Sequence, residues 1–172
     1  MKREILIHPD PRLKKICAPV DDVTGELHDL AKDLLETMYG APGIGLAAPQ
    51  VGVLSRLIVL DCVKAEGEAP RPIIMFNPQV LAVSEELNVY DEGCLSIPDQ
   101  FADVTRPAEV EVAWIDETGT ERREGFDGLW ATCVQHEIDH LEGKLFIDYL
   151  KPLKRQMITR KMQKLKREKA RA

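Results

Sequence analysis

Two histidines and a glutamate occur at a spacing that is typical of a metal-dependent hydrolase. His136, Glu137 and His140 form the pattern His-Glu-x-x-His. On a helix, residues i and i+4 lie on one face about one turn apart, so both imidazoles can bind one metal ion. The glutamate that follows the first histidine can then act as a general base toward a water molecule at that metal. The pattern therefore predicts a hydrolytic metal site.

The segment that carries this pattern is predicted to be a buried helix, from Leu129 to Leu141, that stops at Gly143. Its remaining residues are mostly apolar and lie on more than one helical face, as in helices that are covered on all sides. Two imidazoles and a carboxylate buried there without partners would be costly. A bound metal ion is the simplest partner for both histidines.

Two histidines leave the metal without the third protein ligand that catalytic sites usually have. The acidic residues downstream of the motif are Glu142, Asp148 and Glu168. None of them is well placed, so the third ligand is sought upstream. Cys94 follows Gly93, and a thiolate beside a glycine can approach a metal closely. Spacing alone does not select Cys94 over Cys133, which lies on the same predicted helix as the histidines.

Three segments together carry a resemblance to a known family: Gly43–Gln50, Glu92–Ser96 and Gln135–His140. In this combination and order, the sequence resembles the peptide deformylase family, and the resemblance covers nearly the whole chain from His8 onward. It implies a hydrolase of protein biosynthesis that removes the formyl group from the N-terminal formyl-methionine of nascent polypeptides. The departures are small: Asp99 stands where many members have glycine, and Thr105 precedes Arg106-Pro107.

The resemblance also implies roles for individual residues. It assigns Cys94, His136 and His140 as metal ligands and Glu137 as the general base. It assigns the stabilisation of the oxyanion to the side chain of Gln50 and the backbone N–H of Leu95. A further set is implied to line the substrate groove: Ile44, Gly45, Glu92, Gly93, Arg106, Leu129, Thr132 and Cys133.

The identity of the metal is only weakly fixed. Two imidazoles and one thiolate suit Zn²⁺ by softness and geometry. The family resemblance instead implies Fe²⁺, one ion per chain, with Zn²⁺, Ni²⁺ or Co²⁺ as substitutes. We therefore expect Fe²⁺, with Zn²⁺ as the alternative.

The elements expected around the motif are helices and short strands. A first helix is predicted from Gly25 to Tyr39, with Thr24 as N-cap. A surface loop is expected over 63–72, and a third helix from Leu153 to near the end. The strand signals lie at 56–61, 73–77, 79–84, 110–115 and 120–126. This order predicts an α+β fold, with short, mainly antiparallel sheets around a buried metal-binding helix and with a C-terminal helix.

The charge is distributed unevenly along the 172 residues, whose net charge is −6. Residues 151–172 carry ten Lys or Arg and one Glu, so the preceding 150 residues are strongly acidic. We expect a catalytic domain over 1–150 and a basic C-terminal helix over 151–172. A basic tail suggests a polyanionic partner, and the family resemblance implies the ribosome near the exit tunnel. A solvated helix packed on the body is the alternative.

The remaining expectations concern location and rival functions. Neither a membrane span nor a signal peptide is predicted, so the expected location is cytoplasmic, and a monomer is the default. A small metallopeptidase is a rival function, but it would need a ligand downstream of the motif. A structural metal protein is another, and it would need a fourth protein ligand and no use for Glu137.

Overall fold

The first helix, α1 (Gly25–Gly40), forms where its apolar stripe predicts it. The Oγ1 of Thr24 accepts a hydrogen bond from the N–H of Leu27 at 3.4 Å, which satisfies one of the free N–H groups of the first turn. The face that carries Leu34 and Met38 is fully buried against the sheet. The computed structural model describes all 172 residues, as three α-helices and seven strands with three short 3₁₀ helices.

A five-stranded antiparallel sheet forms the larger part of the body, in the order β1-β2-β3-β6-β7. In β6, Val110, Val112 and Trp114 are buried and their neighbours are half-buried, which confirms the predicted alternation. Since β1 is the last strand on its side, one of its edges is free of strand partners. The bounds of the strands are β1 Gly45–Ala47, β2 Leu57–Leu60, β3 Ile73–Val83, β6 Val110–Ile115 and β7 Glu121–Phe126.

β3 is one strand, where the sequence predicted two. The register with β6 shifts between Phe76 and Gln79, and Asn77 there has a positive φ of 50°. Asn77 tolerates this conformation because its side-chain amide bonds the backbone N–H and C=O of Val20, both at 2.7 Å. The irregularity is thus held inside a continuous strand.

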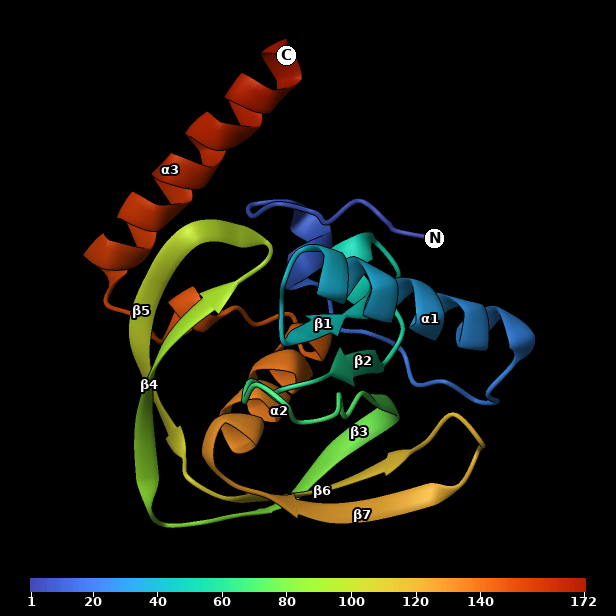
Figure 1. Cartoon of the computed structure of the whole chain (residues 1–172). Helices are drawn as coiled ribbons and strands as arrows, with labels where there is room; N and C mark the ends of the chain where they lie inside the picture. The colour runs from blue at the N-terminus through green and yellow to red at the C-terminus, as the bar shows by residue number, and fades with distance from the viewer.

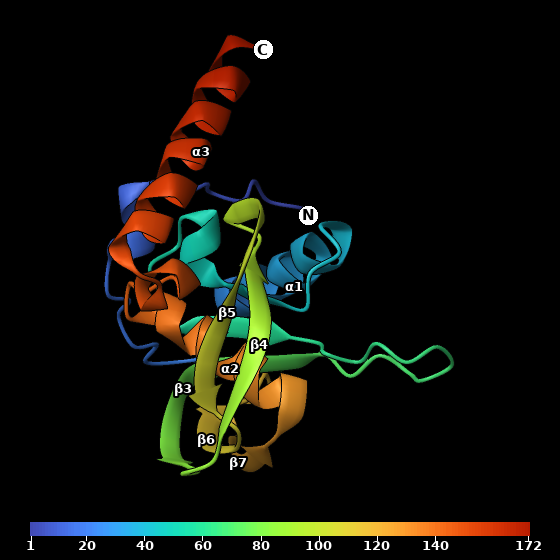
Figure 2. The same cartoon turned by 90° about the vertical axis from the view of Figure 1, so that its left-hand side faces the viewer.

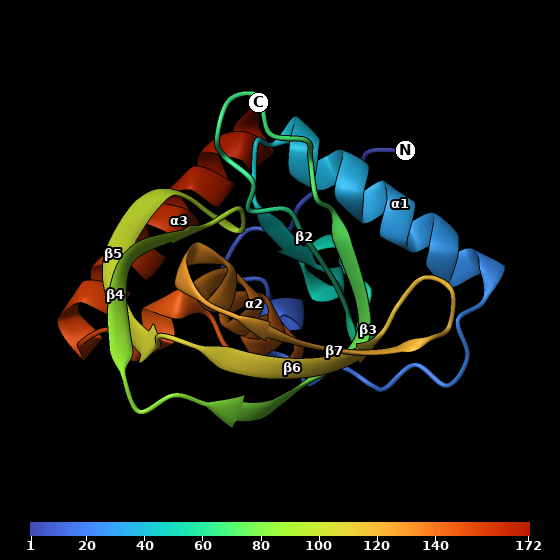
Figure 3. The ribbon, with the colours of Figure 1, turned by 60° about the horizontal axis from the view of Figure 1, so that its bottom comes forward.

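A second sheet consists of β4 (Leu87–Cys94) and β5 (Ile97–Pro107), which pair antiparallel through the turn at 95–96. The sequence signals did not predict these strands as such. Figure 3 shows this long ribbon curving along one side of the molecule, opposite the five-stranded sheet. Cys94, the last residue of β4 before the turn, lies next to His140 of the predicted motif helix.

The predicted buried helix is α2 (Gly128–Leu141), and it lies between the two sheets (Figures 1 and 3). Its Val134 and Leu141 are fully buried in a core that also contains Trp114 and Phe126. Gly143 ends the segment with a φ of 74°, and a side chain there would clash with the backbone of Lys14. The α+β prediction is confirmed, with the motif helix at its centre.

The C-terminal helix is α3 (Pro152–Arg171). It buries Ile158 and Met162 against a second core that contains Leu13 and Phe146. Its far end extends away from the body, as Figures 1 and 2 show. None of the helices has the length and apolar character that a membrane crossing requires. The short 3₁₀ helices are η1 Pro11–Lys14, η2 Ala48–Val51 and η3 Phe146–Tyr149.

The predicted surface loop forms between β2 and β3. Residues 63–72 contain no strand or helix, and every residue from Lys64 to Pro72 is exposed. Figure 2 shows this loop projecting from the body. Its base carries Cys62, which is buried in the same core as Cys133.

Candidate active site

The motif helix α2 presents its two histidines on one face. The ring centroids of His136 and His140 are 5.1 Å apart, as the i, i+4 spacing predicts. His140 is 1% exposed and Glu137 is 2% exposed. Three ionisable side chains are therefore grouped in the interior, where they need polar partners.

Cys94 completes a group of three possible metal ligands. It is the last residue of β4, and its Sγ lies 3.5 Å from the Nε2 of His140. The ligand atoms of Cys94, His136 and His140 all lie within 4.8 Å of one another. One thiolate and two imidazoles at this separation fit a transition metal such as iron or zinc. The Oε1 of Glu137, buried beside them without a hydrogen bond, fits a polar ligand at the same centre.

Glu92 orients His136 from the opposite side. The Oε1 of Glu92 lies 3.0 Å from the Nδ1 of His136, so the other ring nitrogen is the one free to bind a metal. Arg106 donates to both oxygens of Glu92, at 2.7 and 3.0 Å, and to Asp139 at 2.8 Å. Burial alone would raise the pKa of Glu92, but the hydrogen bonds from His136 and Arg106 lower it overall. Glu92 thus remains a buried carboxylate.

Glu137 lies in an environment suited to proton transfer. Burial raises the pKa of its carboxyl group to about 7. A carboxyl group with such a pKa can both accept and return a proton near neutral pH. The backbone of Gly45 on β1 comes close to it: a Cβ there would lie 2.6 Å from the Oε2 of Glu137 and 2.9 Å from the Sγ of Cys133. Glycine is therefore required at this position.

Gln50, on η2, points its amide nitrogen into the site. The N–H of Ala47 donates to the Oε1 of Gln50 at 2.9 Å, which fixes the orientation of the amide. Its Nε2 then donates to the Oγ of Ser96 at 3.1 Å and lies 3.5 Å from the Sγ of Cys94. The side-chain N–H group is held beside the ligand cluster, where it could donate a hydrogen bond to a developing oxyanion.

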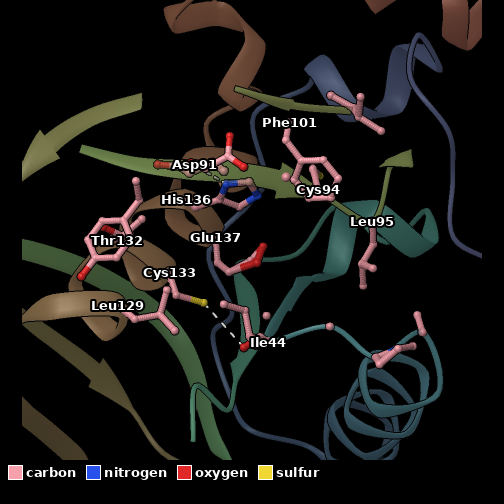
Figure 4. A pocket seen from close by; sticks show the side chains of 18 of the residues that line it. Ile44, Asp91, Cys94, Leu95, Phe101, Leu129, Thr132, Cys133, His136 and Glu137 are labelled. Atoms are coloured by element: carbon pink, nitrogen blue, oxygen red, sulfur yellow. Dashed lines mark hydrogen bonds and ion pairs between the residues drawn. The ribbon is translucent and has the colours of Figure 1, made fainter. Parts of the chain in front are cut away.

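A cavity of about 480 Å³ opens onto this cluster, and Figure 4 shows it with Cys94, His136 and Glu137 at one side and Ile44, Leu129 and Cys133 below. Most of the residues expected from the sequence line it. They are Ile44, Gly45, Gln50, Glu92, Gly93, Cys94, Leu95, Leu129, Thr132, Cys133, His136 and Glu137.

Two expected residues do not line the cavity. His140 lies beneath it, at the ligand cluster. Arg106, which was expected in the groove, is 4% exposed and lies behind the site, where Glu92 and Asp139 hold its guanidinium. A buried, fully paired guanidinium is not available to a substrate. Its contribution is to the orientation of the carboxylate that holds His136.

Several lining residues were not expected from the sequence, among them Lys64, Tyr90, Asp91 and Phe101. The ring of Phe101 lies over Gly93, where a Cβ would come within 2.6 Å of two of its atoms. A side chain at position 93 would therefore displace the ring of Phe101, a neighbour that the sequence did not predict. Asp99, on the same strand, has a φ of 62°, a conformation that glycine adopts most easily and aspartate tolerates.

Comparisons with known proteins agree on one family. A family model described as polypeptide deformylase matches residues 2–156. The peptide deformylase of Rhizobium meliloti strain 1021 is 52% identical over 162 residues, which cover 94% of this chain and 92% of that protein. A crystal structure of a peptide deformylase from Legionella pneumophila matches with a TM-score of 0.90 and 44% identity, over 100% of this chain and 99% of the other. That of Ehrlichia chaffeensis in complex with actinonin matches with a TM-score of 0.92 and 37% identity, over 96% and 98%.

Proposed function

The chain belongs to the polypeptide deformylase family, hydrolases that remove the formyl group from N-terminal formyl-methionine, and we propose that the cavity described above performs this reaction. The observation that carries the proposal is the convergence of Cys94, His136 and His140 beside the buried carboxyl group of Glu137. The substrate is the N-formyl-methionine end of a nascent polypeptide, and the products are formate and a free amine.

Cys94, His136 and His140 would hold the metal. The proposal is supported by the donor set and by the hydrogen bond that leaves one nitrogen of His136 free. A metal in this position supplies Lewis acidity, which lowers the pKa of water and polarises a carbonyl group. We propose Fe²⁺, as the family resemblance implies, with Zn²⁺ as the alternative. Elemental analysis of protein purified without oxygen tests this identity.

The chain's own residues account for the proton transfers. Glu137 would accept the proton of the attacking water and then deliver it to the departing amine nitrogen, as its buried position permits. The Nε2 of Gln50 and the backbone N–H of Leu95 would donate to the oxygen of the tetrahedral intermediate. In other hydrolases, removing one such donor costs about 10²–10³ in turnover.

The free edge of β1 would bind the substrate backbone. An extended peptide can pair with an unpartnered strand and place alternate side chains in pockets. Ile44, Leu129 and Cys133 form an apolar wall next to Glu137, which suits an unbranched methionine side chain. Gly45, Gly93 and Thr132 leave room along the groove, and Glu92 also lines it.

The basic residues of 151–172 would bring the enzyme to the ribosome near the exit tunnel, as the family resemblance implies. In support, most Lys and Arg residues of α3 are exposed, whereas the catalytic cluster lies in the body over 1–150. Phosphate contacts of this kind weaken steeply with salt. A nascent-chain substrate also implies a cytoplasmic location. We propose that the enzyme acts there as a monomer.

Formate release tests the proposed function directly. Metal-loaded protein is incubated with a formyl-Met peptide, with its N-acetyl counterpart and with a longer peptide that has internal bonds to cleave. We expect formate from the first, and neither acetate nor internal cleavage from the others. Internal cleavage would favour the metallopeptidase alternative, and a tightly bound metal without any hydrolysis would favour a structural site.

A further inference from the structure

A second hollow of about 620 Å³ lies next to the catalytic cavity, between the N-terminal segment, the end of α1 and α3. We propose that this hollow, which we call the basic groove, binds acidic side chains of the substrate polypeptide downstream of its formyl-methionine. The inference rests on the proposed function, since it assigns a preferred sequence class to the same substrate. The residues of the basic groove used below are Lys2, Arg3, Arg12, Lys166 and Lys169.

The basic groove adjoins the catalytic cavity directly. Ala41, Leu95 and Pro98 line both hollows. The side chain of Leu95 packs over Gly43, where a Cβ would lie 2.7 Å from its Cδ1. Leu95 also follows the proposed ligand Cys94, so the boundary between the hollows is one residue from the reaction centre. A polypeptide that leaves the catalytic cavity over Leu95 enters the basic groove.

The positive charge of the basic groove is only partly compensated. Arg3 pairs with Asp33, and Arg12 pairs with Asp10. Lys2, Lys166 and Lys169 form no ion pair. Against these three lysines the groove offers one unpaired acid, Glu4.

The body around the basic groove repels acidic peptides. Residues 1–150 carry a large excess of Asp and Glu, and Asp91 and Asp99 line the catalytic cavity itself. A local reversal of sign beside such a site concentrates ligands of the opposite charge there. The catalytic cavity offers a substrate carboxylate only Lys64, whereas the groove offers three lysines, so a carboxylate gains more attraction in the groove.

The lysines are positioned by the body of the protein. The Nζ of Lys166 donates to the backbone carbonyl of Ile7 at 3.5 Å, and Lys166 is half-buried. The side chain of Lys2 passes over Gly40, where a Cβ would lie 2.6 Å from its Cε. Lys169 lies one turn beyond Lys166 on the same face of α3. An extended chain advances about 3.3 Å per residue, so the residues that reach this groove are several positions after the methionine.

The test is a comparison of peptide pairs with full-length, metal-loaded protein. The peptides are formyl-Met octapeptides with amidated C-termini. Each contains two adjacent Glu residues, or two adjacent Gln residues, and the position of the pair varies between residues 3 and 7 across the set. The variant K166E/K169E reverses the groove charge. Its matched control K161E/K164E makes the same change, at the same spacing, on an exposed part of α3 that does not line the groove. Circular dichroism establishes that both variants fold.

We expect wild-type enzyme to show a higher kcat/KM for the Glu peptide than for the Gln peptide at one or more positions. This ratio should fall about three- to tenfold in K166E/K169E, as for the loss of two exposed charge pairs, and should not fall in K161E/K164E. It should also shrink as ionic strength rises. A ratio that is the same in all three proteins, or that falls equally in both variants, would contradict the proposal that the basic groove binds acidic side chains. A failure of wild type to release formate from the Gln peptides would instead overturn the proposed function.

Discussion

The Nδ1 of His136 lies 3.0 Å from the Oε1 of Glu92, and the guanidinium of Arg106 holds both oxygens of that carboxylate. The contact joins β4, β5 and α2, since Glu92 and Arg106 are on paired strands and His136 is on the central helix. It selects which nitrogen of the imidazole carries the proton and which is free. Asp139 and Tyr149 extend the network: Asp139 accepts from Arg106 at 2.8 Å and from the hydroxyl of Tyr149 at 2.7 Å.

Glu92→Gln should weaken metal binding without unfolding the protein. The amide can still contact His136, but it lacks the charge that fixes the ring, and such outer partners contribute about 10- to 100-fold in metal affinity. Competition with a chelator measures the affinity. Glu85→Gln, at an exposed position, is the control. An unchanged affinity in Glu92→Gln would show that the contact does not support the metal.

Arg106→Met should lower the free energy of unfolding by about 3–5 kcal/mol, because it leaves Glu92 as a buried and uncompensated charge. Both side chains of this ion pair are 5% exposed or less. Urea unfolding measures the loss. Arg123→Met, which removes an exposed ion pair with Glu111, should change stability by less than about 1 kcal/mol. Similar losses in the two variants would contradict the role assigned to Arg106.

His8 should make stability depend on pH. Burial lowers its pKa from 6.5 to about 4, with Lys14 and Lys166 adding to the shift and Asp148 opposing it. Between about pH 6.5 and pH 4 the unfolded chain binds a proton that the folded chain excludes, so stability falls as the pH falls through this window. His8→Gln should lose part of that fall.

Urea unfolding at pH 7 and pH 5 measures the effect of His8. His8→Gln also loses the contact between the Nε2 of His8 and the Oγ1 of Thr159, so only the difference between the two pH values is informative. His28→Gln on α1 is the control. If the free energy of unfolding changes equally between pH 7 and pH 5 in wild type and in His8→Gln, His8 does not cause the pH dependence.

The local elements were predictable because their signals are local. The stripe of α1, the cap at Thr24 and the alternation of β6 each follow from residues close together in the chain. The motif helix α2 was equally clear. Its histidines needed only helical spacing to predict a shared ligand, and their ring centroids lie 5.1 Å apart.

The ribbon of β4 and β5 was not predictable in the same way. Leu87 and Val89 face solvent on β4, so apolar residues there do not mark a buried face. The place of Arg106 depends on its pairing with Asn88 across this ribbon, which no spacing along the chain reveals. The sequence therefore predicted Arg106 in the substrate groove. The register of β4 and β5 instead places it behind His136.

Shortening α3 should separate ribosome binding from catalysis. A cut near Thr159, which the sequence alone would suggest, removes the buried Met162. A cut after Leu165 keeps Ile158 and Met162 and removes Lys166, Arg167, Lys169 and Arg171. We expect hydrolysis of a short, neutral formyl-Met peptide to persist and co-sedimentation with ribosomes at low salt to decrease. Equal sedimentation of the two proteins would support the alternative of a solvated helix.

The role of Glu137 in catalysis is tested most directly by formate release from wild-type protein and from Glu137→Gln, with metal content determined on the same samples. Cys94, His136 and His140 are intact in the variant, so it should keep its metal. Without the carboxylate that accepts and returns the proton, turnover of a formyl-Met peptide should fall by more than about 10². Near-normal turnover in metal-loaded Glu137→Gln would contradict the assignment of Glu137 and, with it, the proposed catalytic centre.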